Sequence, residues 1–90
     1  MRYEVRYTSP FKRDFKKAKR QRKDVSKLNA VLALLADGKP LPERNRNHPL
    51  GGDWVGKWEC HLEPDWLLIY MYDGDSVVLY KLGSHSELLD

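Results

Sequence analysis

Three strand-like segments follow one another at the end of the chain, with very short connections between them. Residues 54–62 alternate in polarity, and residues 66–72 are apolar on both sides, as expected of a central strand. A Pro-Asp corner at 64–65 joins these two, and an Asp-Gly pair at 73–74, a strong hairpin signal, leads into the third segment at 76–82. Strands joined by such short turns pair as antiparallel neighbours, so this stretch predicts most of a small sheet.

The alternation also predicts which side chains share a face. In the first segment one face holds Trp54, Gly56, Trp58, Cys60 and Leu62, and the other holds Val55, Lys57, Glu59 and His61. In the third segment Val77, Leu79 and Lys81 share a face. We expect Lys57, His61 and Lys81 to meet on a side of the sheet that is open to solvent.

The first forty residues predict one strand and two helices. Residues 2–7 alternate as a half-buried strand does. Ser9-Pro10 begins a basic helix, because serine caps free N–H groups and proline suits the first helical position. Asp24 caps a second, more apolar helix, and Gly38 ends it as a left-handed residue.

The resulting order of strand, two helices and three strands predicts an α+β fold. We expect the N-terminal strand and the helical hairpin to pack on one face of a small antiparallel sheet, with a short helical turn at 84–89. Residues 1–90 should form a single domain, because a chain of this length has only one compact core. The opposite face of the sheet is then free to carry function.

The composition excludes several classes of protein. No apolar run approaches the roughly 20 residues that span a membrane, and the N-terminus has no signal-peptide pattern. A single cysteine, Cys60, excludes an internal disulfide and Cys-rich zinc sites, and it fits a reducing cytoplasm. Half of the 16 Lys and Arg residues lie at positions 12–23, a run typical of a solvated helix face and also of a surface for nucleic acid or an acidic partner.

The three histidines lie in three separate polar clusters, which we expect to converge on one site. His48 belongs to a long loop at 39–53, and loops of this length are often functional. His61 precedes the Pro-Asp corner, and His85 follows the last strand. Imidazoles exchange protons near neutral pH, and two of them flanking a phosphate can drive attack by a ribose 2′-OH without a metal. A nearby Lys or Arg would stabilise the transition state.

Each of these residues has a structural explanation as well. The histidines can be strand, turn and cap residues, and Asp65 after a proline is a good turn-former. Trp54, Trp58 and Trp66 can simply pack in the core or at its rim. A zinc site from the three histidines and Asp65 is conceivable, but its ligands lie on separate loops without a short paired spacing. Nucleophilic catalysis by Cys60 is disfavoured because this residue lies on the apolar face.

Several separated motifs resemble the YafQ branch of the RelE/ParE toxin superfamily. They are His48-Pro49-Leu50-Gly51-Gly52-Asp53-Trp54-Val55-Gly56, Glu59-Cys60-His61-Leu62-Glu63-Pro64-Asp65-Trp66-Leu67-Leu68-Ile69-Tyr70 and Leu82-Gly83-Ser84-His85-Ser86-Glu87-Leu88-Leu89. Together with the helical hairpin they cover nearly the whole chain in the right order. The resemblance implies a RelE-like fold and a type II toxin: a ribosome-dependent endoribonuclease that cuts mRNA, an mRNA interferase, and is held inactive by a cognate antitoxin.

The same resemblance implies a set of site residues. The family's catalytic positions correspond to His48, His61, Asp65 and His85, and an active-site aromatic corresponds to Trp66. Lys81 stands where an arginine is usual, and Leu89 stands where the family often has phenylalanine. Lysine keeps the positive charge but lacks the planar, two-pronged grip of arginine on a phosphate.

From the resemblance we expect His85 to be the general acid at the 5′-oxygen and His48 or Asp65 to be the general base. His61 would orient the scissile phosphate or share the proton transfer. The substrate-binding residues would be Arg46, Lys57, Trp66, Lys81 and Leu89, with the cations neutralising the phosphate. No metal or cofactor is required. The expected partners are the antitoxin, mRNA and ribosomal RNA, with operator DNA reached only through the antitoxin, no membrane, and a cytoplasmic location.

Two other functions fit the same chain. A ParE-like relative on this scaffold would poison DNA gyrase and would not need a convergent set of histidines. A basic binding module for RNA or a protein partner would use the charged helix as its functional surface and would carry no chemistry. Ribosomal RNA and an acidic antitoxin are both suitable partners for that helix.

Overall fold

The computed structural model describes residues 2–89 and contains a five-stranded sheet flanked by helices. The elements are β1 (Glu4–Tyr7), α1 (Ser9–Arg20), α2 (Val25–Ala36), β2 (His48–Pro49), β3 (Trp58–Glu63), β4 (Trp66–Asp73), β5 (Ser76–Gly83) and α3 (His85–Leu89). The strand order is β1-β5-β4-β3-β2. This confirms the expected α+β fold and places the three consecutive strands at the centre of the sheet.

The sheet is mixed, which corrects the expectation of a purely antiparallel one. Strand β1 pairs in parallel with β5, with Glu4 opposite Ser76 and Tyr7 opposite Leu79. The other neighbouring pairs are antiparallel. The direction of β1 was not fixed by a hairpin, because both helices and three strands separate it from β5, and a parallel pair needs such a long crossover.

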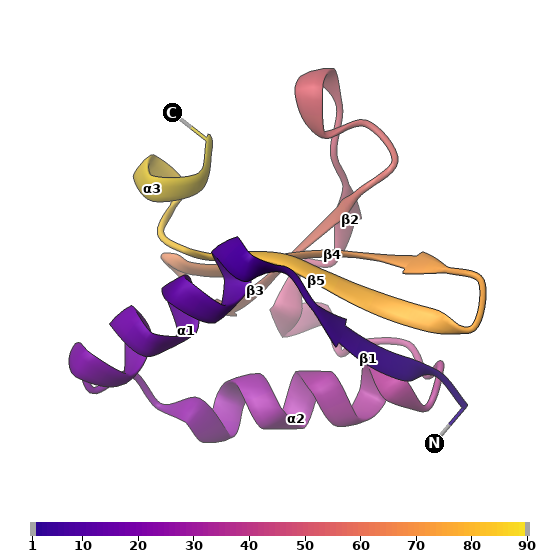
Figure 1. Ribbon diagram of the computed structural model, residues 1–90, viewed down its shortest axis with the longest axis horizontal. Coiled ribbons are helices and arrows are strands. Elements are labelled where there is room, and N and C mark those ends of the chain that lie inside the picture. The colour runs from indigo at the N-terminus through magenta and orange to yellow at the C-terminus, as the bar shows by residue number, and fades with distance from the viewer. Residues whose placement is uncertain (1, 90) are drawn as a thin grey trace.

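Helices α1 and α2 cover one face of the sheet, as Figure 1 shows with the strands seen nearly edge-on. The main core lies between these helices and the sheet. Its buried members are Phe11, Ala18, Leu28, Val31, Leu35, Cys60, Leu62, Trp66, Leu68, Tyr70, Val77, Leu79 and Leu82. The inward position of Cys60 agrees with the alternation read from the sequence.

The ends of the two long helices follow ordinary capping chemistry. Thr8, rather than Ser9, caps α1, since its hydroxyl accepts the backbone N–H of Phe11 at 3.1 Å. Asp24 caps α2 as expected, and Gly38 follows this helix with a φ of 69°. Among residues 2–89, no helix is long and apolar enough to cross a membrane.

The 39–53 loop is more ordered than expected, and β3 begins later. Two short 3₁₀ turns, Glu43–Asn45 and Gly52–Trp54, flank the two-residue strand β2. The strand expected over 54–62 therefore starts only at Trp58, so the predicted shared face of Trp54 and Gly56 is wrong. Left-handed backbone at Gly52 and Gly56 explains the break, because this conformation does not continue a strand.

A bulge in β5 changes the face of Lys81. Tyr70 pairs with Leu79, but Ile69 pairs with Lys81, so one extra residue, Tyr80, lies in β5. Val77 and Leu79 point into the main core, and the extra residue turns Lys81 to the opposite side, together with Ile69. The predicted common face of Val77, Leu79 and Lys81 is thus wrong.

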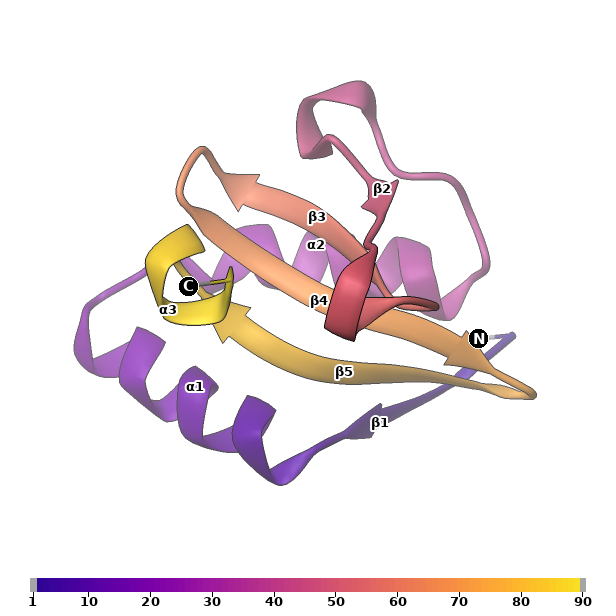
Figure 2. The same cartoon turned by 90° about the horizontal axis from the view of Figure 1, so that it is seen from above.

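The second face of the sheet is partly covered. Leu67, Ile69 and Leu88 form a small buried cluster on this side, against which Leu50, Trp54 and Tyr80 pack. Figure 2 shows α3 and the 3₁₀ turn before β3 lying over this face at some distance from each other. The expectation of a wholly free face is corrected: the available surface is the part around β2 and β3 and beside α3.

Candidate active site

His48 is placed by the pairing of β2 with β3. It lies directly opposite Glu59 in the ladder, and directly opposed side chains in a sheet are close neighbours. Its Nδ1 lies 2.7 Å from the carbonyl oxygen of Arg46, an atom that can only accept, so Nδ1 carries the proton. The remaining nitrogen, Nε2, is then the one that exchanges protons, and it lies 3.4 Å from Glu59 Oε1.

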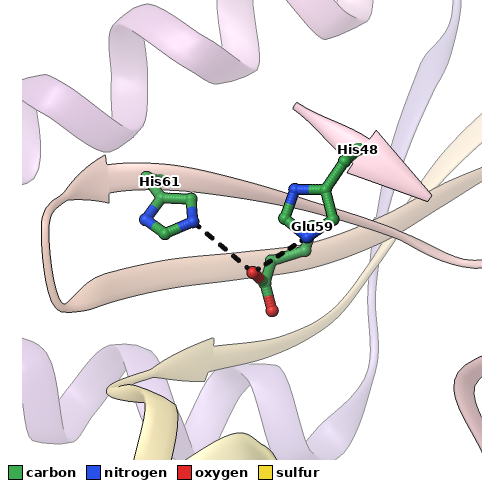
Figure 3. A group of neighbouring side chains, drawn as sticks. All are labelled: His48, Glu59 and His61. Carbon is green, nitrogen blue, oxygen red and sulfur yellow. Dashed lines mark ion pairs between the residues drawn. The ribbon is translucent and has the colours of Figure 1, made fainter. Parts of the chain in front are cut away.

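Glu59 is the central group of the cluster and was absent from the predicted site residues. It lies two residues before His61 on β3, so both side chains point to the same face. Its Oε1 is 3.5 Å from His61 Nε2 and faces His48 as well, as Figure 3 shows. Glu59 is 2% exposed and His61 is 8% exposed. The sequence signals for Glu59 were its i, i+2 spacing from His61 and its place at the start of the family motif at 59–70.

Two asparagines fasten the loop that carries His48 to the sheet, and sequence reasoning missed both. Asn45 is 6% exposed and donates from Nδ2 to the carbonyl of His61 at 2.8 Å. Asn47 accepts the hydroxyl of Tyr70 at 2.6 Å. A buried amide left without its partner is costly, so the Asn45 bond holds the loop in one register against β3, and the bond of the exposed Asn47 adds a second contact.

His85 is positioned by Asp65 on the β3–β4 corner. The backbone N–H and the Nδ1 of His85 lie 2.9 and 2.8 Å from the same oxygen, Asp65 Oδ1. The backbone N–H of His85, followed by its imidazole, lowers the pKa of the Asp65 carboxyl. This carboxylate therefore stays ionised and orients His85, whose Nε2 points away from the contact.

A capping box and an ion pair hold α3, and hence His85, against the body of the protein. Ser84 N–H donates to Glu87 Oε1 at 2.8 Å, while Glu87 N–H donates to Ser84 Oγ at 3.2 Å. Lys17 of α1 donates to the other oxygen of Glu87. These contacts, led by Lys17, lower the pKa of Glu87 to about 2.

The three imidazoles form a row on the second face of the sheet. The ring centroids of His48 and His61 are 6.2 Å apart, and those of His61 and His85 are 5.4 Å apart. The structure therefore brings together all four residues expected at the catalytic positions. Asp65 is hydrogen-bonded to His85, and the carboxylate of Glu59 lies 3.4 and 3.5 Å from the other two imidazoles. Two exchangeable nitrogens at the ends of this row can serve opposite sides of a phosphodiester.

The predicted cations are distributed around this row. Lys57 Nζ lies 4.7 Å from the centroid of the Tyr80 ring, on the histidine side of the sheet. Lys81 Nζ is 3.5 Å from Asp14 Oδ2 on α1, so its charge already has a partner. Arg46 has left-handed backbone and, with Lys27 and Arg44, lines a shallow cleft that also contains His61.

Two predicted substrate contacts are not placed at the site. Trp66 is 2% exposed and belongs to the main core on the helix side of the sheet, where its ring cannot stack on a base. The reason is register: Trp66 shares the face of Leu68 and Tyr70, not that of Leu67. The side chain of Leu89 lies outside the described residues.

Cys60 has no role in this chemistry. It is fully buried on the helix face, and burial raises the pKa of its thiol to about 12. A thiol in this state is a packing group, as its position on the apolar face of β3 indicates.

The fold and the imidazole row together define a small α+β protein whose site suits acid–base chemistry on a phosphodiester. A family described as "Bacterial toxin of type II toxin-antitoxin system, YafQ" matches residues 3–90. The mRNA interferase toxin YafQ of Escherichia coli K12 is 35% identical over 86 residues, which cover 94% of either chain. The chain belongs to the YafQ family of type II toxins.

Solved structures agree over the full length of the chain. A copper-bound mutant toxin from Helicobacter pylori superposes with a TM-score of 0.94 at 37% identity, covering 97% of this chain and 99% of that one. The E. coli DinJ–YafQ toxin–antitoxin complex superposes with a TM-score of 0.90 at 33% identity, and the match covers 100% of both chains. The RelE-like arrangement expected from the motifs is thus confirmed.

Proposed function

We propose that this toxin is an mRNA interferase that cleaves mRNA on the ribosome by attack of a ribose 2′-OH on the adjacent phosphate. The observation that carries the proposal is the row of three imidazoles, in which Nδ1 of His48 and Nδ1 of His85 are each held by a protein oxygen. Among the described residues Nε2 of neither ring makes a hydrogen bond, and that of His48 lies 3.4 Å from Glu59 Oε1. In this reaction the bond from the 2′-oxygen to phosphorus forms, and the bond from phosphorus to the 5′-oxygen breaks. The products are a 2′,3′-cyclic phosphate and a free 5′-hydroxyl.

His48 is the general base of this proposal. Its Nδ1 is engaged by the Arg46 carbonyl, so Nε2 takes the proton of the 2′-OH. Asp65 was the other expected base. Its lowered pKa makes it a weak proton acceptor, and both of its contacts go to His85. These two facts favour His48.

His85 is the general acid. With Nδ1 donating to Asp65, a protonated His85 presents Nε2–H to the departing 5′-oxygen, and the carboxylate stabilises the imidazolium until transfer. Asp65 is thus a positioning residue. A side chain that is half exposed, as that of His85 is, can reach a phosphate in solvent.

His61 and Glu59 support the base. Glu59 lies between His48 and His61 and is too buried to touch substrate, so its carboxylate orients both rings. His61 stands between the base and the acid, where a phosphate oxygen can accept a hydrogen bond from its ring. Lys81, Lys57 and Arg46 would neutralise the growing negative charge of the phosphate. These proton transfers use only side chains of the protein.

The antitoxin has a suitable surface away from the histidines. Tyr7, Phe11, Phe15 and Leu32 line an apolar groove between α1 and α2, with Lys12 and Lys16 on its rim. An apolar groove with a cationic rim fits an amphipathic helix that carries acidic residues. We assign this groove to the antitoxin and the opposite face to RNA. Operator DNA would be reached only through the antitoxin, and action on ribosomes implies a cytoplasmic location.

The test is cleavage of a defined mRNA in a translation system with purified components. The wild-type toxin should cut ribosome-bound mRNA and leave 2′,3′-cyclic phosphate ends, while His85→Ala should cut at least about 100-fold more slowly. Antitoxin binding, measured by calorimetry, should be unchanged in this variant. A fully active His85→Ala protein would remove this residue from the mechanism. Inhibition of gyrase on supercoiled DNA, without RNA cleavage, would point instead to a ParE-like function.

A further inference from the structure

Proton transfer by the two outer histidines gives the bound RNA a direction. His48 takes the proton of the 2′-OH, so the nucleotide that carries this hydroxyl lies at the β2 end of the imidazole row. His85 protonates the departing 5′-oxygen, so the nucleotide that begins with this oxygen lies at the α3 end. This direction rests on the proposed function. It places the next phosphate on the 5′ side beyond His48, at the edge of the sheet that β2 forms.

A cleft of about 250 Å³ lies at this edge of the sheet. Strand β2 pairs with β3 only at positions 58–59, so the edge of β3 beside His61 faces this cleft and not another strand of the described chain. The lining includes three cations, Lys27, Arg44 and Arg46, and one carboxylate, Glu63. The cleft therefore joins the imidazole row to a positively charged surface, which attracts a phosphate.

The backbone of Arg44 is fixed beside this cleft. Arg44 is the middle residue of the 3₁₀ turn Glu43–Asn45. The next residue, Asn45, is 6% exposed and donates to the carbonyl of His61 at 2.8 Å. The side chain of Arg44 is exposed and makes no ion pair with any residue between 2 and 89. Arg44 thus combines an anchored backbone with a guanidinium whose charge is not used by the fold.

The other two cations of the cleft are less suited to a phosphate at this position. Lys27 already pairs with Glu63 at 3.1 Å. Arg46 holds His48 through its carbonyl, so its side chain begins beside the proposed base and suits the cleaved phosphate. Arg44 offers a planar fork that can meet two oxygens of one phosphate, a grip that an ammonium group does not provide.

We propose that Arg44 binds the phosphate immediately 5′ of the nucleotide that supplies the attacking 2′-OH. The mRNA then crosses the face of the sheet with its 5′ side at the β2 edge and its 3′ side at α3. Figure 2 shows β2 and α3 apart from each other on this face. Arg44 takes no part in proton transfer. It is a binding residue that fixes the direction and the register of the RNA on the histidines.

The experiment combines a change in the toxin with a change in the RNA, in the translation system with purified components. After the cleavage site is mapped, a synthetic mRNA receives a neutral methylphosphonate in place of the phosphate that Arg44 is proposed to bind. On the unmodified mRNA, Arg44→Gln should raise KM about tenfold, the loss typical of a charged hydrogen bond, and leave kcat within about twofold. On the methylphosphonate mRNA, wild type and Arg44→Gln should have KM values within about twofold of each other, since the charge that Arg44 binds is gone.

Two controls match these changes. Arg6→Gln removes an exposed arginine from β1, at the opposite edge of the sheet, and any effect on KM should be the same on both mRNAs. A methylphosphonate placed one nucleotide downstream of the cleaved bond should leave the full effect of Arg44→Gln in place. Circular dichroism checks that both variants are folded.

An unchanged KM of Arg44→Gln on the unmodified mRNA would overturn the proposal. An equal loss on both mRNAs would overturn it as well and would assign Arg44 to ribosomal RNA. If the downstream methylphosphonate, and not the upstream one, abolished the effect, the RNA would run in the opposite direction. Absence of cleavage by the wild type would contradict the proposed function itself, and the direction assigned to the RNA would fall with it.

Discussion

One carboxylate oxygen, Asp65 Oδ1, accepts both the backbone N–H of His85 at 2.9 Å and its imidazole Nδ1–H at 2.8 Å. The corner between β3 and β4 thereby determines both the start of α3 and the orientation of the ring. The pKa of the Asp65 carboxyl is lowered because its charged form receives these bonds, so it remains a carboxylate throughout the neutral range. The proposed general acid is thus oriented by a carboxylate oxygen whose two hydrogen bonds both come from His85.

Replacing Asp65 with Asn should reduce cleavage by about 10–100-fold, as loss of an orienting partner commonly does. The amide can still accept the backbone N–H, but it cannot stabilise an imidazolium. Initial rates on ribosome-bound mRNA measure the loss, and the nitrogen chemical shifts of His85 report its tautomer. Glu63→Gln is the matched control, because Glu63 is on the same corner but pairs with Lys27 at 3.1 Å. Full activity of Asp65→Asn with an unchanged His85 tautomer would contradict this role.

Asn45→Ala should destabilise the protein by about 1–3 kcal/mol, because the buried carbonyl of His61 loses its donor. Denaturation in urea measures this change in the free energy of unfolding. Cleavage should fall as well, since the loop that carries His48 is no longer held on β3. A control is Asn29→Ala, an exposed position on α2, which should alter neither quantity. Wild-type stability of Asn45→Ala would show that this bond does not position the loop.

Asp14→Asn should strengthen RNA binding by up to about fivefold, because Lys81 is released from a partly exposed ion pair that contributes about 1 kcal/mol. The amide oxygen can still accept the backbone N–H of Leu82, which Asp14 accepts at 2.9 Å. The KM for ribosome-bound mRNA is the measurement. Glu4→Gln, which removes one negative charge from the exposed edge strand, controls for net charge. Equal KM values for Asp14→Asn and wild type would mean that Lys81 does not meet the phosphate.

The stabilisation from Glu87 should depend on pH in a defined direction. Its pKa is lowered from an ordinary 4.5 to about 2 in the folded protein, first by the Lys17 contact and then by the Ser84 backbone. A carboxyl with a lowered folded-state pKa stabilises fully above its unfolded value and loses this contribution as pH falls from 4.5 to about 2. The difference in unfolding free energy between wild type and Glu87→Gln should therefore shrink across this interval.

Urea denaturation at several pH values gives this difference directly. The difference in unfolding free energy between wild type and Lys17→Met should shrink over the same interval, because this substitution removes the other member of the pair. A difference that stays constant from pH 6 to pH 2 would assign the effect of Glu87→Gln to packing. Both substitutions should also slow cleavage, since α3 carries His85.

Local patterns in the sequence were sufficient to predict the main helices and strands, and to predict on which face of a strand many side chains lie. Alternation along β3 placed Cys60 in the core and His61 on the other side, as the structure has them. Asp24 and Gly38 marked the ends of α2 because capping depends on a few neighbouring atoms. The motifs around the three histidines were sufficient to predict the family to which the chain belongs.

Tertiary structure decided what depends on distant parts of the chain. The bulge at Tyr80 moved Lys81 to the histidine face, where Asp14 on α1 reaches it. The register of β4 placed Trp66 in the core. The parallel pairing of β1 with β5 covers the edge of β5 that does not pair with β4. Periodicity within one segment carries no information about these pairings.

The cluster of Glu59 with His48 and His61 shows most clearly which features the sequence determines and which depend on the tertiary structure. The sequence alone determined that a strand would present Glu59 and His61 on one face, and that His48 would stand in a loop. Only the folded chain brought that loop onto β3, through Asn45 and Asn47, and closed the surroundings so that Glu59 became 2% exposed. Charge and proton chemistry at such a site depend on burial and distance, which are properties of the assembled sheet.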